Sequence, residues 1–171
     1  MPLLALLLLL LVLPAAADEL SVNLGGGPQP DADQSNWGGG ADWEFWRTSR
    51  SPRQQLSLGA SISQMATDGP GNQQLTAIGF YPQLTLLAQP RDGWQPYFFV
   101  RALGPHWLSA RSLGERQQGE HFAFQAQVGI GVVAPDRWFI ALSYKHFSNA
   151  KLFEPNDGID LPLVLTLGQR W

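Results

Sequence analysis

Short segments in which apolar residues alternate with small or polar ones recur along most of this chain. In the first of them, Leu20, Val22 and Leu24 alternate with Ser21 and Asn23. A period of two residues places all the apolar side chains on one face of an extended strand. Eight such segments cover residues 20–25, 36–45, 56–63, 78–86, 94–108, 122–132, 138–145 and 163–171. The pattern predicts an all-β protein of eight strands.

The composition of the second face indicates where these strands lie. That face carries Ser, Gly, Gln, Asn and Thr more often than the charged residues of a water-facing surface. Four tryptophans, at positions 46, 94, 107 and 138, recur near segment ends, as in the aromatic girdles of membrane barrels. The chain also stops on Trp171 directly at the end of its last strand, which resembles the C-terminal signal of bacterial outer-membrane proteins. We therefore predict an eight-stranded antiparallel transmembrane β-barrel of the bacterial outer membrane.

Closure of the sheet pairs every backbone N–H and C=O internally, as hydrocarbon requires. Eight strands leave an interior filled by side chains, which argues against a pore. We expect Arg101 and Lys145 in this interior, as partners of Asp42 and Glu44. His106 and His121 are expected to lie at the polar rim.

The fifth segment, residues 94–108, has apolar residues at both odd-numbered and even-numbered positions. Polar breaks separate the segments at residues 26–35, 47–52, 68–72, 89–93, 109–119, 135–136 and 149–160.

The N-terminus has the features of an export signal. Residues 3–13 are almost unbroken leucine, and a small-residue cleavage site follows at residues 15–17. We expect residues 1–17 to be a signal peptide and residues 18–171 to form a single β-barrel domain. No later stretch is apolar and long enough for a membrane-spanning helix. The formal net charge of −3 argues against nucleic acid as a partner.

His146 and Ser148 carry the chemistry that this pattern leaves unexplained. With an even number of strands both termini lie on the periplasmic side, so residues 149–160 form an external loop. His146 and Ser148 share parity with the bilayer-facing residues and are expected at the level of the outer leaflet. Two residues apart on a strand, they lie on one face, where the imidazole can activate the hydroxyl. Glu154, Asp157 and Asp160 are available as the carboxylate that orients the histidine.

The stretch His-Phe-Ser-Asn-Ala at 146–150, followed by Pro-Asn-Asp-Gly-Ile-Asp at 155–160, resembles the signature of the lipid A 3-O-deacylases of the PagL type. These are eight-stranded outer-membrane barrels. The resemblance implies His146 as general base, Ser148 as nucleophile and Asp160 as the orienting acid. It implies that Asn149 supports the oxyanion or the local geometry, and that Asn156 has a structural or supporting role.

Two positions depart from that signature. Asp160 stands where the family has Glu, and its side chain is one methylene shorter, so the loop must approach more closely. Lys151 stands where the family typically has Gly, at a position proposed to supply an oxyanion-hole N–H. A positive φ at that position disfavours Lys.

The resemblance implies a serine esterase that removes the 3-hydroxyacyl chain from position 3 of lipid A in the outer leaflet, with no metal or cofactor. Its partners would be lipopolysaccharide and outer-membrane lipids, with formation of a homodimer left open. Three alternatives remain: a non-catalytic structural barrel, a lipid A acyltransferase of the palmitoyltransferase type, and a soluble lipocalin-like carrier.

Overall fold

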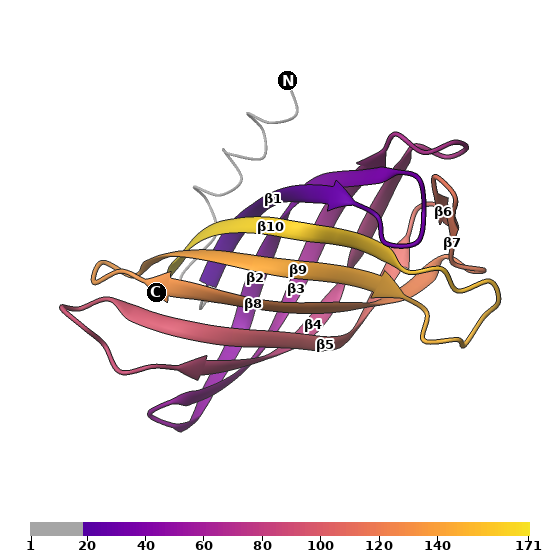
Figure 1. Cartoon of the computed structure of the whole chain (residues 1–171). Helices are drawn as coiled ribbons and strands as arrows, with labels where there is room; N and C mark the ends of the chain where they lie inside the picture. The colour runs from indigo at the N-terminus through magenta and orange to yellow at the C-terminus, as the bar shows by residue number, and fades with distance from the viewer. Residues whose placement is uncertain (1–18) are drawn as a thin grey trace.

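The computed structural model describes residues 19–171, and eight long strands account for most of them (Figure 1). These strands are β1 (Glu19–Pro28), β2 (Ser35–Ser51), β3 (Gln54–Thr67), β4 (Gln74–Leu87), β5 (Gln95–Leu108), β8 (Phe122–Val133), β9 (Trp138–Ser148) and β10 (Ile159–Arg170). Neighbours pair antiparallel in the order β1-β10-β9-β8-β5-β4-β3-β2, and β1 also pairs with β2. The eight strands therefore form a closed antiparallel barrel, as the alternation predicts. The expected signal peptide, residues 1–17, lies outside the described residues.

The two ends of the barrel differ in the length of their connections. At one end, which we call the terminal end, β1 begins and β10 stops, with Glu19 opposite Arg170. Its turns between β2 and β3 and between β8 and β9 are short, and residues 88–94 form the longer connection between β4 and β5. The opposite end, the loop end, carries the connections 28–35, 67–74, 108–122 and 148–159. No helix in residues 19–171 is long and apolar enough to cross a membrane.

Four of the expected polar breaks contain strand residues. Within residues 26–35, β1 continues to Pro28 and β2 begins at Ser35, and within residues 149–160, β10 begins at Ile159. Residues 47–52 were expected to be a break, but β2 continues to Ser51 and β3 begins at Gln54, because the polar side chains here still pair across a two-stranded extension. Within residues 109–119, β6 (Ser112–Leu113) and β7 (Arg116–Gln117) form a small hairpin that lies over the loop end (Figure 1). This hairpin contacts the candidate site described below.

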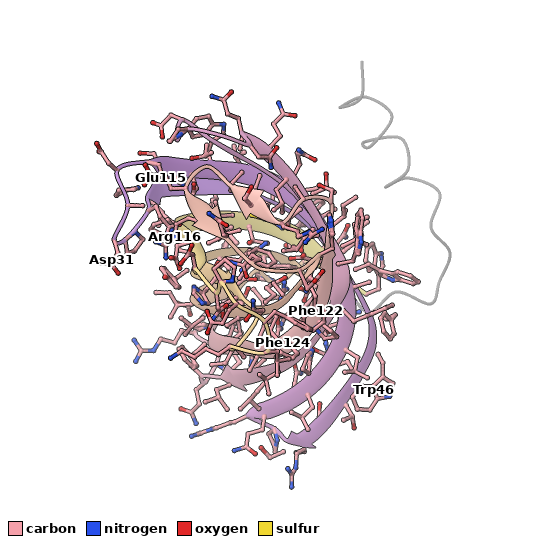
Figure 2. All side chains as sticks on the ribbon, turned by 90° about the vertical axis from the view of Figure 1, so that its right-hand side faces the viewer. Asp31, Trp46, Glu115, Arg116, Phe122 and Phe124 are labelled. Atoms are coloured by element: carbon pink, nitrogen blue, oxygen red, sulfur yellow. The ribbon has the colours of Figure 1, made fainter. Side chains whose placement is uncertain are left out.

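The outward face of the barrel is apolar and carries all seven tryptophans. Each of them is exposed: Trp43, Trp46, Trp94, Trp138 and Trp171 toward the terminal end, and Trp37 and Trp107 toward the loop end. Between these two groups lie exposed aliphatic side chains such as Ile62, Ile130 and Leu142. Viewed from the loop end, Trp46 lies outside the ring of strands (Figure 2). The apolar band between two aromatic belts is the surface of a membrane barrel.

Polar side chains fill the middle of the lumen (Figure 2). Arg101 Nη1 donates to Asp42 Oδ2 over 2.8 Å, and Arg101 Nε donates to Gln83 over 2.7 Å. The expected pairing of Lys145 with Glu44 is wrong. Lys145 Nζ instead donates to Asn23 and Ser63. Glu44 is paired with Arg47, which approaches it from the terminal end along β2.

The prediction that His106 lies at the polar rim is wrong. Its imidazole is fully buried in the lumen, where Nε2 lies 2.7 Å from Ser61 Oγ and Nδ1 lies 2.9 Å from the Gly104 carbonyl oxygen. His121 is exposed just before β8 and stacks on Trp107.

A β-bulge in β5 explains the mixed parity of residues 94–108. The pairing of β5 with β8 shifts register between Arg101 and Gly104, and Leu103 takes a φ of 56°. Before the bulge the odd-numbered Tyr97 and Phe99 face the lumen, whereas beyond it the even-numbered His106 does. One extra residue exchanges the two faces of a strand.

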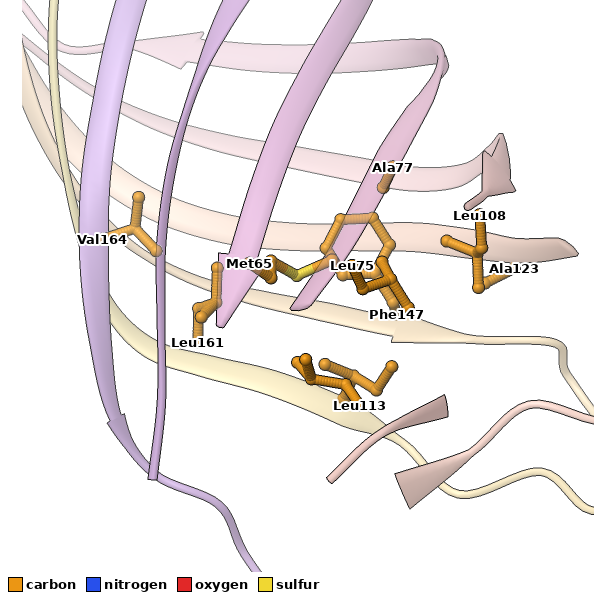
Figure 3. Packing of buried hydrophobic residues seen from close by; sticks show 10 residues of the cluster. Met65, Leu75, Ala77, Leu108, Leu113, Ala123, Phe147, Leu161 and Val164 are labelled. Carbon is orange, nitrogen blue, oxygen red and sulfur yellow. The ribbon is translucent and has the colours of Figure 1, made fainter. Parts of the chain in front are cut away.

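Ten buried side chains close the lumen near the loop end (Figure 3). They include Phe147 from β9 and Ile159 and Leu161 from β10, all fully or almost fully buried. Phe147 is opposite Ile159 in the register. The inward side chains of β9 and β10 are therefore anchored in this apolar cluster. Because outward residues alternate with these inward residues along both strands, the cluster also fixes the positions of the outward side chains that form the candidate site.

Candidate active site

His146, Ser148 and Asp160 come from two paired strands at the loop end. His146 and Ser148 are at the end of β9, and Asp160 is the second residue of β10. In the antiparallel register Asp160 lies directly opposite His146. Directly opposed residues on one face of a sheet bring their Cβ atoms within about 5 Å.

A second β-bulge places Asp160 on this outer face. The register between β9 and β10 shifts between Leu161 and Val164, so Pro162 and Leu163 form the irregularity. Beyond it the even-numbered residues of β10 face the lumen. A regular strand would therefore turn Asp160 inward, away from His146. Bulges redirect side chains next to active sites, and proline is tolerated in a strand at such a point.

The imidazole and the carboxylate are in direct contact. His146 Nδ1 lies 2.7 Å from Asp160 Oδ1. The histidine side chain is 32% exposed and the aspartate side chain 6% exposed, so the acid lies beneath a base that reaches the surface. An ionised carboxylate only accepts hydrogen bonds, so Nδ1 carries the proton and Nε2 is left with its lone pair. This is the tautomer that a general base needs.

Ser148 lies beside this pair, on the side of β8, where it is opposite Phe124. Its Cα is about 7 Å from that of His146, as the i, i+2 spacing on a strand requires. In residues 19–171 no hydrogen bond joins Ser148 Oγ to the imidazole. Such bonds are often long in the absence of substrate and shorten when it binds.

Asn149 organises the loop that follows Ser148. Its backbone N–H donates to Asn156 Oδ1 over 2.8 Å. Its buried side-chain nitrogen donates to the carbonyl oxygens of Gln118, Phe153 and Pro155 over 2.5, 2.8 and 3.3 Å. The donors of Asn149 thus fold the loop back on itself and tie it to Gln118, the residue that follows β7.

The two residues after Asn149 have left-handed backbones. Ala150 has a φ of 54° and Lys151 a φ of 63°. Neither of their N–H groups donates a hydrogen bond within the part of the chain that the structure describes. Successive N–H groups in such turns form concave anion-binding sites.

Aromatic side chains border the site on the side of β8. Phe122 packs edge to face against Phe124, with ring centroids 5.0 Å apart, and against Phe153 at 6.4 Å. Leu152 and Phe153 in the loop are exposed. A polar His–Asp pair beside an exposed apolar wall suits a substrate that has a polar ester and a hydrocarbon chain.

Comparison with known proteins identifies the family of the chain. Residues 32–166 match the model of the family described as lipid A 3-O-deacylase (PagL). The chain belongs to the lipid A 3-O-deacylase (PagL) family. A curated relative, the lipid A deacylase PagL of Bordetella bronchiseptica, is 35% identical over 65 residues, which cover 37% of this chain and 36% of the relative. The chain thus matches about a third of the length of that relative.

The fold comparison covers more of the chain. The crystal structure of the outer membrane enzyme PagL superposes with a TM-score of 0.68 and covers 90% of this chain and 99% of the other, at 18% sequence identity. At this identity the likeness concerns the fold, an eight-stranded barrel. The predicted fold class and the predicted family are therefore confirmed.

Of the three carboxylates that the sequence offers in this PagL family member, only Asp160 touches His146 in the described residues. Glu154 is exposed at the tip of the loop. Asp157 Oδ2 accepts the Gln117 N–H over 3.0 Å and so holds the loop to β7. Asn149 and Asn156 meet each other, and both support the loop.

Three further residues contact Asp160, and strand parity in the sequence indicates the position of only one of them, Tyr144. The Tyr144 hydroxyl donates to Asp160 Oδ1, and Gln29 Nε2 donates to Asp160 Oδ2 over 2.7 Å. Asn36 Nδ2 donates to the Asp160 backbone oxygen over 3.1 Å. The parity of β9 places Tyr144 two residues before His146, on the same face. Gln29 and Asn36 are more than 120 residues away from Asp160, and only the closure of the barrel brings them together.

Proposed function

We propose that this chain is a lipid A deacylase of the outer membrane, which hydrolyses the ester of the 3-hydroxyacyl chain at position 3 of lipid A. The observation that carries the proposal is the hydrogen bond between His146 Nδ1 and Asp160 Oδ1, at 2.7 Å, beside an outward-facing serine at the loop end. Membership of the lipid A 3-O-deacylase family supports the substrate. The apolar outer face supports a site that meets its substrate within the outer leaflet.

In the proposed reaction Ser148 Oγ attacks the ester carbonyl carbon, and its proton passes to His146 Nε2. Asp160 stabilises the imidazolium that forms. His146 then gives the proton to the departing sugar oxygen, which leaves an acyl group on Ser148. A water molecule, deprotonated by His146, attacks this acyl carbon and releases the 3-hydroxy fatty acid, and the proton returns to Ser148.

The negative charge that develops on the ester oxygen needs donors aimed at it. We assign this role to the backbone N–H groups of Ala150 and Lys151. Their left-handed φ angles and the absence of a hydrogen bond from either group in residues 19–171 support the assignment. The side chain of Asn149 is used for three loop carbonyls, so its proposed role is to hold the turn.

The proposed location follows from the same surface. Export directed by residues 1–17, with removal of that segment, would leave residues 18–171 in the outer membrane with the loop end outward. The charged and polar groups of the site would then lie at the level of the lipid A headgroup, and the aliphatic band below it would face acyl chains.

The test is the lipid A mass profile of cells that express the wild type or Ser148→Ala. We expect the wild type to remove one hydroxyacyl chain and the variant to leave lipid A intact. A gain in mass would identify an acyltransferase instead, and an unchanged profile with a folded barrel would identify a non-catalytic one. Equal deacylation by the Ser148→Ala variant would exclude the serine mechanism.

A further inference from the structure

The Asp160 carboxylate is held from both sides. On the outer side, Oδ1 accepts from His146 Nδ1 and from the Tyr144 hydroxyl. On the inner side, Oδ2 accepts from Gln29 Nε2 over 2.7 Å, and Gln29 Oε1 accepts the Asp160 backbone N–H over 2.9 Å. Gln29 therefore fixes both the backbone and the side chain of the acid.

Gln29 is the last member of a row of three buried side-chain amides. Asn36 Nδ2 donates to Gln29 Oε1 over 2.6 Å, and Gln34 Nε2 donates to Asn36 Oδ1 over 2.8 Å. The row begins at the β6–β7 hairpin, where the Glu115 N–H donates to Gln34 Oε1 over 2.8 Å. We call Gln34, Asn36 and Gln29 the amide chain.

The two ends of the amide chain set its direction. A backbone N–H can only donate, and an ionised carboxylate can only accept. With Glu115 N–H at one end and Asp160 at the other, each amide must accept from the preceding group and donate to the next one. Aligned in this way, the three amide dipoles point their positive ends toward Asp160, and chains of hydrogen bonds in a buried site reinforce one another.

Every polar atom of the amide chain has a partner. The second hydrogens on the three amide nitrogens go to the carbonyl oxygens of Pro30, Asp160 and Leu113. By contrast, the nearby side-chain oxygens of Gln118 and Asn149 are buried and have no partner in residues 19–171. A fully satisfied polar network in a buried site has a single arrangement, which makes it suited to hold a group in one orientation.

We propose that the amide chain positions the Asp160 carboxylate, and through it the His146 imidazole, for ester hydrolysis, with Gln29 as the link that acts on the acid directly. The three amides are positioning residues, because none of them reaches the reacting atoms. The inference rests on the proposed function, since it assigns these residues to that reaction. It also adds the β1–β2 loop and the β6–β7 hairpin to the support of the site.

The test compares the full-length protein in detergent micelles with three variants, Gln29→Met, Asn36→Leu and Gln34→Met, each of which keeps the side-chain size and removes the amide. Gln127→Met is the matched control. Gln127 is an equally buried glutamine that donates to Ser143 Oγ over 2.8 Å and has no contact with Asp160. Folding is checked by the resistance of the barrel to unfolding on unheated gels.

We expect Gln29→Met to lower kcat about tenfold with KM unchanged, because the variant loses the hydrogen bond to the Asp160 carboxylate and the acceptor for the Asp160 backbone N–H, which weakens the orientation of the acid. The loss should decrease in the order Gln29, Asn36, Gln34, and Gln127→Met should retain wild-type kcat. An unchanged kcat in folded Gln29→Met, or equal losses in all four variants, would overturn the proposal.

A second measurement does not depend on catalysis. The proton between a histidine Nδ1 and a carboxylate gives a far-downfield NMR signal, which His146→Asn would assign. We expect Gln29→Met to shift or remove this signal and Gln127→Met to leave it in place. A signal that Gln29→Met leaves unchanged would overturn the positioning role. If the signal responds but the wild type does not act on lipid A, the amide chain stands and the proposed function fails.

Discussion

Gly158 lies so close to the imidazole of His146 that a β-carbon at position 158 would come within 2.5 Å of His146 Cε1. The glycine has this position because the loop after β9 returns directly over the ring before it enters β10. Its carbonyl oxygen accepts a hydrogen bond from Arg116 Nε over 2.8 Å, which ties the loop to the β6–β7 hairpin. The histidine thus has a carboxylate beneath it and a backbone surface against one edge.

Gly158→Ala should displace the imidazole while the barrel stays folded. A real β-carbon cannot remain at 2.5 Å, so either the ring or the loop must move. A displacement of about 1 Å at a catalytic group costs on the order of 100-fold in rate. We expect a loss of that size in kcat/KM on lipid A micelles. Wild-type activity in Gly158→Ala would mean that His146 is not held against the loop during turnover.

Asp160→Asn should be much more damaging than Glu154→Ala. An asparagine can donate to His146 Nδ1, which moves the ring proton to Nε2 and removes the lone pair that accepts the serine proton. The same change in a serine protease triad lowers kcat by roughly 10⁴-fold, and we expect a loss of similar order here. Glu154 is exposed and has no contact with His146. Its removal should change kcat less than about twofold.

The measurement is the initial rate of fatty-acid release from lipopolysaccharide, with both variants first shown to be folded. The reverse result, in which Glu154→Ala is inactive and Asp160→Asn is active, would assign the acid to the loop tip.

Lys151→Gly should retain activity. Lys151 has a φ of 63°, where a residue with a β-carbon is strained by about 1 kcal/mol or more, and glycine is not. Glycine keeps the backbone N–H that we assign to the oxyanion. We expect kcat within about threefold of the wild type and no lower thermal stability. If Lys151→Gly instead raises KM many-fold at unchanged kcat, the ammonium group binds the substrate.

Asp42→Ala should destabilise the barrel without acting on the site. It leaves Arg101 buried in the lumen without its carboxylate, and breaking a buried pair in this way costs about 3 kcal/mol. Urea unfolding followed by tryptophan fluorescence measures this loss. The double variant Asp42→Leu with Arg101→Met should recover most of it, and Asp136→Ala in an exposed turn serves as control. An unchanged free energy of unfolding in Asp42→Ala would show that the pair contributes little.

The alternation of residues predicts the barrel because inward and outward positions in a membrane barrel have different chemistry. The prediction fails where one residue is inserted. Leu103 at its positive φ exchanges the faces of β5, which turns His106 into the lumen. Lys145 is also misassigned, because strand parity gives the face of a residue but not its height along the barrel axis. At the height of Lys145 the neighbours are Asn23 and Ser63.

The same distinction applies to the candidate site. Local spacing predicts the positions of some of its residues, whereas only the fold places the others. His146 and Ser148 are local neighbours, so their shared face can be predicted from spacing alone. Asp160 could be placed only by resemblance, because simple parity in β10 puts it in the lumen and the bulge at Pro162 reverses this. Gln29 and Asn36 lie in and beside a polar break at the other end of the chain. Their contact with Asp160 depends on the pairing of β1 with β10, which closes the barrel. The residue pattern along a single strand does not indicate which other strand it pairs with.

The outward orientation of His146 and Ser148 has a kinetic consequence. In the proposed reaction an enzyme whose site faces the bilayer meets its substrate by lateral diffusion, so it responds to the mole fraction of lipid A in the surface and not to its concentration in solution. Added neutral lipid or detergent should slow the reaction by diluting that surface, even when the total amounts of enzyme and lipid A stay constant. The mole fraction of lipid A in the membrane would then determine the rate of hydrolysis.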